Sequence, residues 1–333
     1  MRVLAATLAL AGAAFIAIGP TTPSIAEDAP VDVTIGVSSN SFALGGVRIA
    51  EQAGLFKRNG INLKIVVMDS GNAAITALVA GSAQFAASGP GEAITARARK
   101  QPIVIVANFY RGLSASVIIA KSVADKSGVK SDAPLSERLR VLNGLAVAEP
   151  SATSAYVAPV KGAADAAGVS LKLVYMAQPA MVAALDTGAI QAMVAGAPFW
   201  GPAITKGSGV LWISGPKGEL PAADSPASSS CLQTSEAYAK ANPETIRRLK
   251  AVMADLARFL KEQPDEAKAA LARAYPQIDK ASIDLAFGQD WQNWAQPTFS
   301  EDDIRHEIEL LKKNRATIPG LDTVNVQDVL RYQ

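Results

Sequence analysis

Residues Ser70–Glu92 read SGNAAITALVAGSAQFAASGPGE, and this stretch decides the fold class that the sequence predicts. Its first three residues are loop and capping types, and the apolar residues after them recur at helical spacing until Gly81 stops the helix. The apolar run over 83–87 is long enough for one buried strand, and Ser88–Gly91 turns the chain into a second helix. Helix, strand and helix in such close succession are typical of an α/β domain.

The frame A-L-x-x-G-x-x-Q-x-x-x-x-G occurs twice, beginning at Ala77 and again at Ala184. It places Gln84 and Gln191 at equivalent positions. An Ala-rich chain can produce such a frame by chance, so similar local chemistry at two turns is the simpler interpretation. Because segments of similar order surround both copies, we favour two α/β domains of like architecture that face each other.

Strand-like and helix-like segments alternate through both halves of the chain, which predicts α/β domains with mostly parallel sheets. The expected strands are 33–37, 63–68, 83–87, 103–107, 116–120, 142–148, 171–176, 189–194 and 210–214, and the expected helices include 45–59, 92–100, 156–167 and 180–187. We expect a loop over 215–230 and a helical chain from Ser235 onward. The predicted domains are lobe 1, made of 31–112 and 228–333, and lobe 2, made of 113–227.

The N-terminal segment has the pattern of a secretory signal peptide. Arg2 supplies the charge, Val3–Ile18 is apolar, and Ser24–Ala26 is a cleavage site of small residues. A transmembrane anchor is the alternative, but the run is short for one and no charged stop follows it. We therefore predict a signal peptide over 1–26 and an exported, unlipidated protein.

Composition argues against several classes of protein. The formal net charge of +2 gives no sign of a nucleic-acid surface or a polybasic membrane patch. The chain holds one cysteine, Cys231, and one histidine, His306, so no internal disulfide or usual zinc cluster can form. We therefore expect a protein without metal or cofactor, and one that is not an enzyme.

Small polar and aromatic residues follow the predicted strands where helices begin. In open parallel sheets ligands bind at the carboxyl ends of strands, and helix N-termini there favour anions. For any single loop ordinary helix capping is the simpler interpretation, but several such loops meeting at one cleft favour a ligand site. The candidate ligand-binding residues are Ser39, Asn40, Phe42, Ser70, Gly71, Asn72, Ser88, Gly89, Arg111, Ser151, Thr153, Ser154, Tyr156, Phe199 and Trp200.

Two of these candidates carry specific hypotheses. Arg111 precedes the first crossing between the predicted domains, so its guanidinium is expected at the cleft floor, where it can hold a carboxylate or sulfonate through two hydrogen bonds. The alternative is an exposed hinge arginine, or one paired with Glu149 or Glu92. Trp200 is expected to form a wall of the ligand site, and the alternative is a core residue.

The segment AEQAGLFKRNGINL over Ala50–Leu63, together with the two A-L-x-x-G-x-x-Q frames and the leader, resembles the substrate-binding proteins of ABC importers of the nitrate/sulfonate/taurine type. These share their fold with thiamine-precursor-binding proteins, and the resemblance covers about 33–275. It implies a type II periplasmic binding protein fold, with two α/β lobes, a hinge and the ligand between them. This chain has Gln84 and Gln191 where the family's frames usually carry an acid.

The resemblance also implies a function and a location. The implied protein is a periplasmic monomer that captures a small, anionic organic ligand and delivers it to a membrane permease with its ATPase, without nucleic acid, metal or cofactor. The alternatives are a pyrimidine-precursor binding or synthesis protein of the same fold, and the effector-sensing domain of a regulator.

Overall fold

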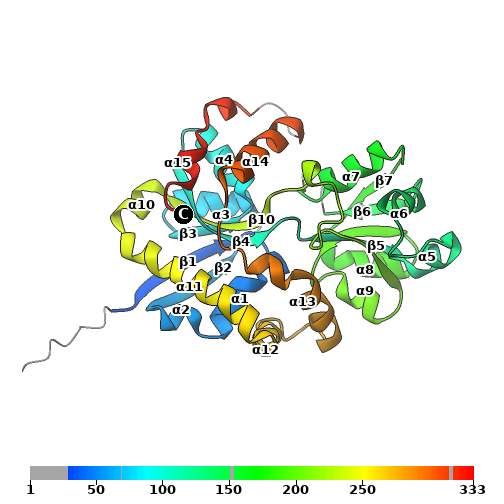
Figure 1. Ribbon diagram of the computed structural model, residues 1–333, viewed down its shortest axis with the longest axis horizontal. Coiled ribbons are helices and arrows are strands. Elements are labelled where there is room, and N and C mark those ends of the chain that lie inside the picture. The colour runs from blue at the N-terminus through cyan, green and yellow to red at the C-terminus, as the bar shows by residue number, and fades with distance from the viewer. Residues whose placement is uncertain (1–28, 69, 151–153, 315–317) are drawn as a thin grey trace, which may run out of the picture.

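The structure is a computed structural model that describes residues 29–68, 70–150, 154–314 and 318–333. The predicted signal peptide lies outside the described residues. The chain forms two lobes side by side, each built on one five-stranded sheet (Figure 1).

Lobe 1 is built on the sheet with strand order β2-β1-β3-β10-β4. Its strands are β1 Val31–Val37, β2 Ile61–Val67, β3 Phe85–Ser88, β4 Ile103–Arg111 and β10 Ser228–Ser235. β1 is parallel to β2 and β3, whereas β10 is antiparallel to both β3 and β4. β1 to β4 therefore all run in the same direction, and their carboxyl ends share one edge of the sheet.

Lobe 2 is built on the sheet with strand order β7-β6-β8-β5-β9. Its strands are β5 Ala115–Ala120, β6 Ala146–Glu149, β7 Lys172–Tyr175, β8 Ala192–Gly196 and β9 Gly209–Ser214. β6 is parallel to β7 and β8, and β5 is antiparallel to both of its neighbours. Each sheet is thus mixed, with an antiparallel strand inside it, where the sequence predicted mostly parallel sheets.

Helices cover both sheets, and most of them belong to lobe 1. In lobe 1 they are η1 Phe42–Leu44, α1 Gly45–Gln52, α2 Leu55–Arg58, α3 Gly71–Val79, α4 Pro90–Ala98, α10 Glu236–Ala241, α11 Pro243–Glu262, α12 Pro264–Ala274, α13 Lys280–Trp294, α14 Glu301–Asn314, η3 Leu321–Thr323 and α15 Val326–Leu330. In lobe 2 they are α5 Lys121–Ser127, α6 Leu135–Val141, α7 Val157–Ala166, α8 Gln178–Asp186, α9 Gly201–Thr205 and η2 Ala222–Asp224. The helix expected over 45–59 is two helices, because Gly54 between them takes the left-handed conformation at φ +72°.

The repeated frame builds the same turn in both lobes. In lobe 1 the side-chain oxygen of Gln84 accepts the Thr34 N–H at 2.8 Å, and the Gln84 N–H donates to the Thr34 carbonyl at 3.2 Å. In lobe 2 the side-chain oxygen of Gln191 accepts the Ala146 N–H at 3.0 Å, and its N–H donates to the Ala146 carbonyl at 2.9 Å. Each glutamine thereby ties the start of one strand to its parallel neighbour. The prediction of two domains of like architecture is confirmed at this turn.

Helix starts in the C-terminal segment also follow the sequence signals. α11 begins at Pro243, which occupies the first helical position after Asn242. The predicted capping box before α14 is present, since Ser300 Oγ accepts the Asp303 N–H at 3.2 Å and Asp303 Oδ2 accepts the Ser300 N–H at 2.7 Å.

β10 is not among the strands that the sequence predicts: its first three residues fall in the expected loop over 215–230, and its last, Ser235, begins the expected helical chain. Its sequence, SSSCLQTS, has no alternation of apolar and polar residues, although nearly all of its side chains are buried. Hydrogen bonds compensate this burial: Ser228 Oγ donates to Asn108 Oδ1 at 2.8 Å, and Thr234 Oγ1 donates to the Gln84 carbonyl at 2.7 Å. A polar strand is tolerated here because both neighbouring strands supply partners.

The lobes are joined by the chain and by packing. The chain crosses from β4 to β5 and returns from β9 to β10, and Figure 1 shows both crossings between the lobes. α13, from the C-terminal segment, reaches lobe 2 and packs on α9, where Gly201 leaves room for Ser282. One hydrophobic cluster includes Phe42 and Trp294 from lobe 1 and Met193 and Trp200 from lobe 2.

Candidate functional site

The carboxyl ends of strands from the two sheets face each other where the lobes meet. β1 ends beside Phe42, whose N–H donates to the carbonyl of Ala197, just after β8, at 2.8 Å. At the first crossing, the Ser114 N–H donates to Ser229 Oγ at 2.9 Å, which ties this crossing to the start of β10. Strand ends of both lobes therefore border a common region beside the hinge.

A set of buried and half-buried polar side chains lies in this region, and we call it the inter-lobe polar cluster. Its members are Tyr110, Asp290 and Asn293 of lobe 1 and Ser114, Glu149 and Tyr156 of lobe 2.

The lobe 1 half of the cluster joins the end of β4 to α13. The Tyr110 hydroxyl donates to Asp290 Oδ1, and the Asn293 amide contacts the Tyr110 hydroxyl at 3.4 Å. The same amide donates to the Pro216 carbonyl of lobe 2 at 3.0 Å. Gln289 directly precedes Asp290 on α13, and its Oε1 accepts the Ser214 hydroxyl at 2.8 Å. This face of α13 is therefore directed at lobe 2 and the hinge.

The lobe 2 half of the cluster centres on Tyr156, which precedes α7. Its hydroxyl lies 3.1 Å from Ser114 Oγ. Gly196 ends β8 beside it, and a Cβ at Gly196 would lie 3.1 Å from that hydroxyl and 3.8 Å from Gln178 Oε1. Glycine at this position therefore allows the tyrosine to approach the strand end closely.

Two carboxyl groups of the cluster have raised pKa values. Burial raises the pKa of Glu149 to about 8, and none of the described residues hydrogen-bonds either of its carboxyl oxygens. Burial also raises the pKa of Asp290, to about 7, against the lowering effect of the hydrogen bond from Tyr110. The Tyr156 hydroxyl has its pKa raised first by burial and further by the charges of Asp290 and Glu149, so it lies within electrostatic range of both.

Arg111 is held by an acid that the sequence analysis did not consider. Its two terminal nitrogens donate to the two oxygens of Asp303 on α14, each at 2.6 Å. Burial of Asp303 raises its pKa, but the hydrogen bonds from Arg111 and Ser300 outweigh this and the net shift is downward. Arg111 is therefore paired, but with neither Glu149 nor Glu92. Its role as a ligand anchor stays a prediction, with its guanidinium fork already occupied in this structure.

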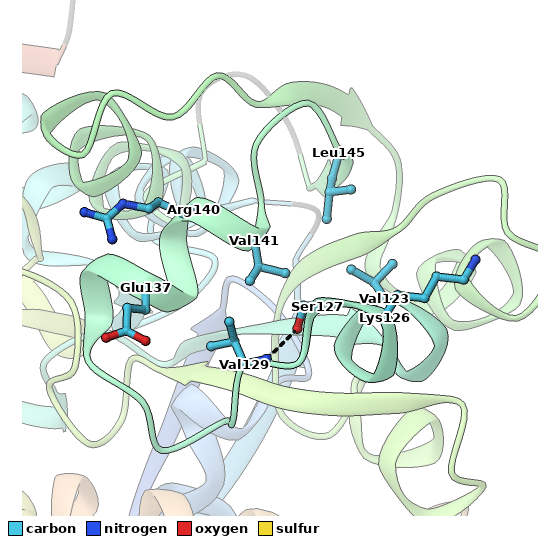
Figure 2. A pocket seen from close by; sticks show the side chains of 8 residues that line it. All are labelled: Val123, Lys126, Ser127, Val129, Glu137, Arg140, Val141 and Leu145. Atoms are coloured by element: carbon cyan, nitrogen blue, oxygen red, sulfur yellow. Dashed lines mark hydrogen bonds between the residues drawn. The ribbon is translucent and has the colours of Figure 1, made fainter.

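Two hollows among the described residues differ in position. A cavity of about 490 Å³ borders the crossings and is lined by Arg111, Asn293, Asp303 and His306 of lobe 1 and by the loop 215–227. A second hollow, of about 600 Å³, lies on lobe 2 between α5 and α6, where mostly apolar side chains surround the Ser127 hydroxyl that accepts the Val129 N–H (Figure 2). Both helices lie at the outer end of lobe 2 in Figure 1, so this hollow is not an inter-lobe site.

The other candidate residues in lobe 1 lie at or near the carboxyl edge of its sheet. Ser39 Oγ and Ser41 Oγ are 3.0 Å apart, and Ser70 Oγ accepts the Ala73 N–H, which caps α3. Asn40 Oδ1 accepts from Arg48, and Gly71 and Asn72 form the first turn of α3. Ser88 is fully buried, and the Gln233 amide contacts its hydroxyl at 3.1 Å and the Gly89 carbonyl at 2.9 Å. Most of these polar groups thus have partners within lobe 1.

The aromatic candidates lie in two places, the hydrophobic core and the polar cluster. Phe42 and Trp200 are buried in the core that the two lobes share, and their role in a ligand site stays a prediction. Phe199 is partly buried against the same core. Tyr156 is the candidate that reaches the polar cluster, and its N–H donates to Ser154 Oγ at 3.2 Å. Ser151 and Thr153 lie outside the described residues.

Four residues of the polar cluster are not among the candidates predicted from the sequence, namely Ser114, Glu149, Asp290 and Asn293. Glu149 had a local signal, since it is a charged residue at the end of an apolar strand and was considered only as a partner for Arg111. Asp290 and Asn293 had none, because they lie on a helix far along the chain whose place beside β4 depends on the tertiary fold.

The described residues contain no group of three or more His, Cys, Asp or Glu side chains arranged to hold a metal ion. They also contain no helix with the length and apolar character needed to cross a membrane.

Solved structures of periplasmic binding proteins are similar to this chain over most of its length. The periplasmic aliphatic sulphonate binding protein SsuA from Escherichia coli is similar to this chain, with 17% identity, a TM-score of 0.66, and coverage of 90% of this chain and 99% of that one. SsuA from Xanthomonas axonopodis pv. citri bound to MOPS has 16% identity and a TM-score of 0.65, over 89% of this chain and 98% of that one. The periplasmic nitrate-binding protein NrtA from Synechocystis PCC 6803 has 17% identity and a TM-score of 0.62, over 91% and 88%.

These likenesses confirm the type II periplasmic binding protein fold with its two α/β lobes. A search of curated protein sequences finds no match to this chain. A family model, described as the NMT1-like family, matches residues 26–275, which is most of the chain. The chain belongs to the NMT1-like family.

Proposed function

We propose that this protein is the exported ligand-binding component of an ABC importer, which captures a small polar organic molecule between its lobes and delivers it to a membrane permease with its ATPase. The observation that carries the proposal is the inter-lobe polar cluster. It draws side chains from both lobes, and it contains carboxyl oxygens that none of the described residues hydrogen-bonds.

The connection between the lobes supports a closing motion. Two crossings of the chain border the cluster, and rotation about such segments opens and closes a cleft. A ligand shifts this equilibrium only through contacts that it makes better in the closed state, so it must touch both lobes. Tyr110 and Tyr156 are placed on opposite lobes for such contacts.

Export and the membrane partner rest on other observations. The signal-peptide pattern over 1–26 supports export to the periplasm. The likeness to sulfonate-binding and nitrate-binding periplasmic proteins supports a permease partner. The anionic ligand class implied by the resemblance has less support, because Arg111 is already paired with Asp303.

Small-angle X-ray scattering on the chain from Glu27 onward tests the proposal. Ligands are first selected by thermal shift from a panel of small amines, sulfonates, carboxylates and neutral alcohols. We expect the best compound to reduce the radius of gyration at saturation, because it bridges the lobes. An unchanged radius of gyration at proven saturation would argue against capture by closure.

The same sample tests the enzymatic alternative. After prolonged incubation with the protein, the selected compound is recovered and analysed by mass spectrometry. We expect it to be unchanged, with full occupancy in a repeat titration. A new product that forms in proportion to protein concentration would favour a synthesis enzyme of the same fold.

A further inference from the structure

The segment that returns from lobe 2 to lobe 1, residues 215–227, is fastened to lobe 2 over most of its length. Arg138 on α6 donates to Glu219 Oε2 at 2.9 Å. Leu220 is buried in the hydrophobic core of lobe 2, and Asp224 in η2 packs against α7. Residues up to the end of η2 therefore move with lobe 2 when the lobes rotate.

The two crossings of the chain lie side by side at Gly112. The Gly112 N–H donates to the Ala227 carbonyl at 2.8 Å, and the Gly112 carbonyl accepts the Ser229 hydroxyl at 2.8 Å. Gly112 also has φ +74°, a left-handed conformation that glycine adopts without strain. Hinges are a few loop residues that absorb a change in backbone angles, so we expect lobe 2 to pivot about Gly112 and the chain beside Ala227.

α14 of lobe 1 contacts the returning segment at this pivot and beyond it. At the pivot, Glu307 Oε1 accepts the Ala227 N–H at 2.6 Å. Beyond it, His306 Nε2 lies 2.8 Å from the carbonyl oxygen of Ser225. A carbonyl oxygen only accepts hydrogen bonds, so Nε2 carries the proton and is the donor. The Ser225 hydroxyl donates to the Pro221 carbonyl before η2 at 2.9 Å, so His306 holds a part of lobe 2.

Lys313 makes a second contact beyond the pivot. It lies about two turns after His306 on α14, and its Nζ donates to Asp224 Oδ1 at 2.5 Å. The Asp224 side chain is only 17% exposed, because it is held between α14 and α7. Solvent screens an ion pair with an exposed lysine, so this contact is weak alone and acts together with that of His306.

These contacts hold the lobes in an arrangement in which their strand ends touch. The Phe42 N–H of lobe 1 donates to the Ala197 carbonyl of lobe 2 at 2.8 Å, and Trp200 is buried in the core that both lobes share. A cavity of about 490 Å³ lies beside the contacts and has His306 and Ser225 in its wall. Since close packing does not fill this side of the returning segment, its polar contacts with α14 contribute more to holding it in place.

We propose that His306 and Lys313 form a latch with which α14 stabilises the closed arrangement of the lobes. Opening the cleft separates both contacts, because α14 belongs to lobe 1 whereas Ser225 and Asp224 move with lobe 2. Neither latch residue belongs to the inter-lobe polar cluster, so the latch adjusts the balance between open and closed lobes without contacting a ligand held there. A ligand that binds the closed arrangement binds more weakly when that arrangement is less populated, so the latch also sets the apparent affinity. This inference rests on the hinge motion of the proposed function, and it can fail while the binding role stands.

Spin labels at the carboxyl ends of two strands measure the opening. Val67 and Tyr175 end the edge strands β2 and β7 of opposite lobes, and their side chains are 52% and 50% exposed. Val67→Cys and Tyr175→Cys are labelled with nitroxides in the chain from Glu27 onward, after Cys231→Ala removes the buried native cysteine. Double electron–electron resonance without ligand then gives the distribution of distances between the lobes. We expect one dominant short distance when the latch is intact.

Variants of α14 show whether the latch is responsible. His306→Phe keeps a ring but removes the donor, and Lys313→Gln keeps a long side chain but removes the charge. Each should move part of the population to longer distances, and the double variant should raise the open fraction several-fold. Lys312→Gln is the matched control: this neighbouring lysine pairs with Glu309 and Asp322, both in lobe 1, so its distances should match those of the intact latch. Circular dichroism confirms that each variant is folded.

A ligand separates this inference from the proposed function. The compound selected by thermal shift should bind several-fold more weakly to the double variant and still shorten its inter-lobe distances. Unchanged distances and unchanged affinity in the folded double variant would overturn the latch and leave the binding role intact. Equal opening in Lys312→Gln, or long distances when the latch is intact, would also overturn it. If the latch variants open but no compound shortens the distances, the latch stands and capture by closure fails.

Discussion

The two lobes share one scaffold but present different chemistry at their strand ends. The glutamine turn is the same in both, since Gln84 and Gln191 each bond a neighbouring strand through side chain and main chain. At the lobe 1 edge, Ser88 and Gly89 are held by the Gln233 amide of the same lobe. At the lobe 2 edge, Glu149 has no partner among the described residues. The repeat therefore specifies the architecture that the lobes share, and residues outside it make the two strand edges differ.

The largest expected effect is on stability as a function of pH. Burial raises the pKa of Glu149 from its ordinary value of 4.5 to about 8, so the folded state binds the proton more tightly than the unfolded state does. Its contribution is fully present below pH 4.5 and is lost as the pH rises to 8, which amounts to up to about 5 kcal/mol. Urea unfolding at pH 5 and pH 8 measures the difference.

Glu149→Gln should reduce that pH dependence, because the amide does not ionise. Asp290 and Glu307, with pKa values raised to about 7 and about 8, should leave part of it in place. Glu137→Gln is the control, since the same substitution at an exposed site of lobe 2 should leave the slope unchanged. A wild-type protein that is more stable at pH 8 than at pH 5 would contradict this account of the lobe 2 edge.

The shared scaffold predicts equal losses at the two glutamine turns. Gln84→Ala and Gln191→Ala each remove the acceptor of a backbone N–H, so each should lower the free energy of unfolding by about 1–3 kcal/mol. Gln52→Ala, on an exposed helical position, should change it little. Chemical denaturation of the three variants gives the comparison. A large loss at one turn and none at the other would mean that the repeat is not structurally equivalent.

Glycine substitutions test the difference between the strand ends. A Cβ at Gly196 would lie 3.1 Å from the Tyr156 hydroxyl, so Gly196→Ala should displace that hydroxyl and weaken ligand binding several-fold. Gly89→Ala in lobe 1 meets a carboxylate oxygen of Glu92 at 3.0 Å, outside the polar cluster, and should affect binding less. Calorimetry with the compound selected by thermal shift ranks the two variants, and the reverse order would place the ligand on the lobe 1 edge.

The smallest expected effect is at the first crossing. Because Asp303 already holds both terminal nitrogens of Arg111, Arg111→Ala should cost about 1 kcal/mol of stability and leave ligand affinity nearly unchanged. Asp303→Asn, which removes the charge of the same pair, should have a similar effect on unfolding. If Arg111→Ala instead abolishes the binding of a sulfonate, the sequence-based role of Arg111 as a ligand anchor would be supported.

Local signals in the sequence accounted for much of the fold. The capping box at Ser300 and the start of α11 at Pro243 each depend on residues within one turn of chain. β10 could not be predicted in the same way, because its buried polar side chains find partners far away in sequence, such as Asn108 on β4 and Gln84 just before β3.

The candidate site was less predictable for the same physical reason. Loops at strand ends can be recognised locally, and Tyr156 was found in this way. Asp290, in contrast, becomes a site residue only because α13 packs beside β4 and brings it to Tyr110. Whether a polar side chain is free for a ligand or satisfied by the protein depends on such distant contacts.

Calorimetric titration of the compound selected by thermal shift into the wild type, Tyr110→Phe and Tyr156→Phe tests the central claim most directly. Tyr110 belongs to lobe 1 and its hydroxyl donates to Asp290, whereas Tyr156 belongs to lobe 2 and its hydroxyl lies 3.1 Å from Ser114 Oγ. Since a ligand that closes the lobes must touch both of them, each variant should weaken binding several-fold. Wild-type affinity in both variants would contradict a ligand held between the lobes by the polar cluster.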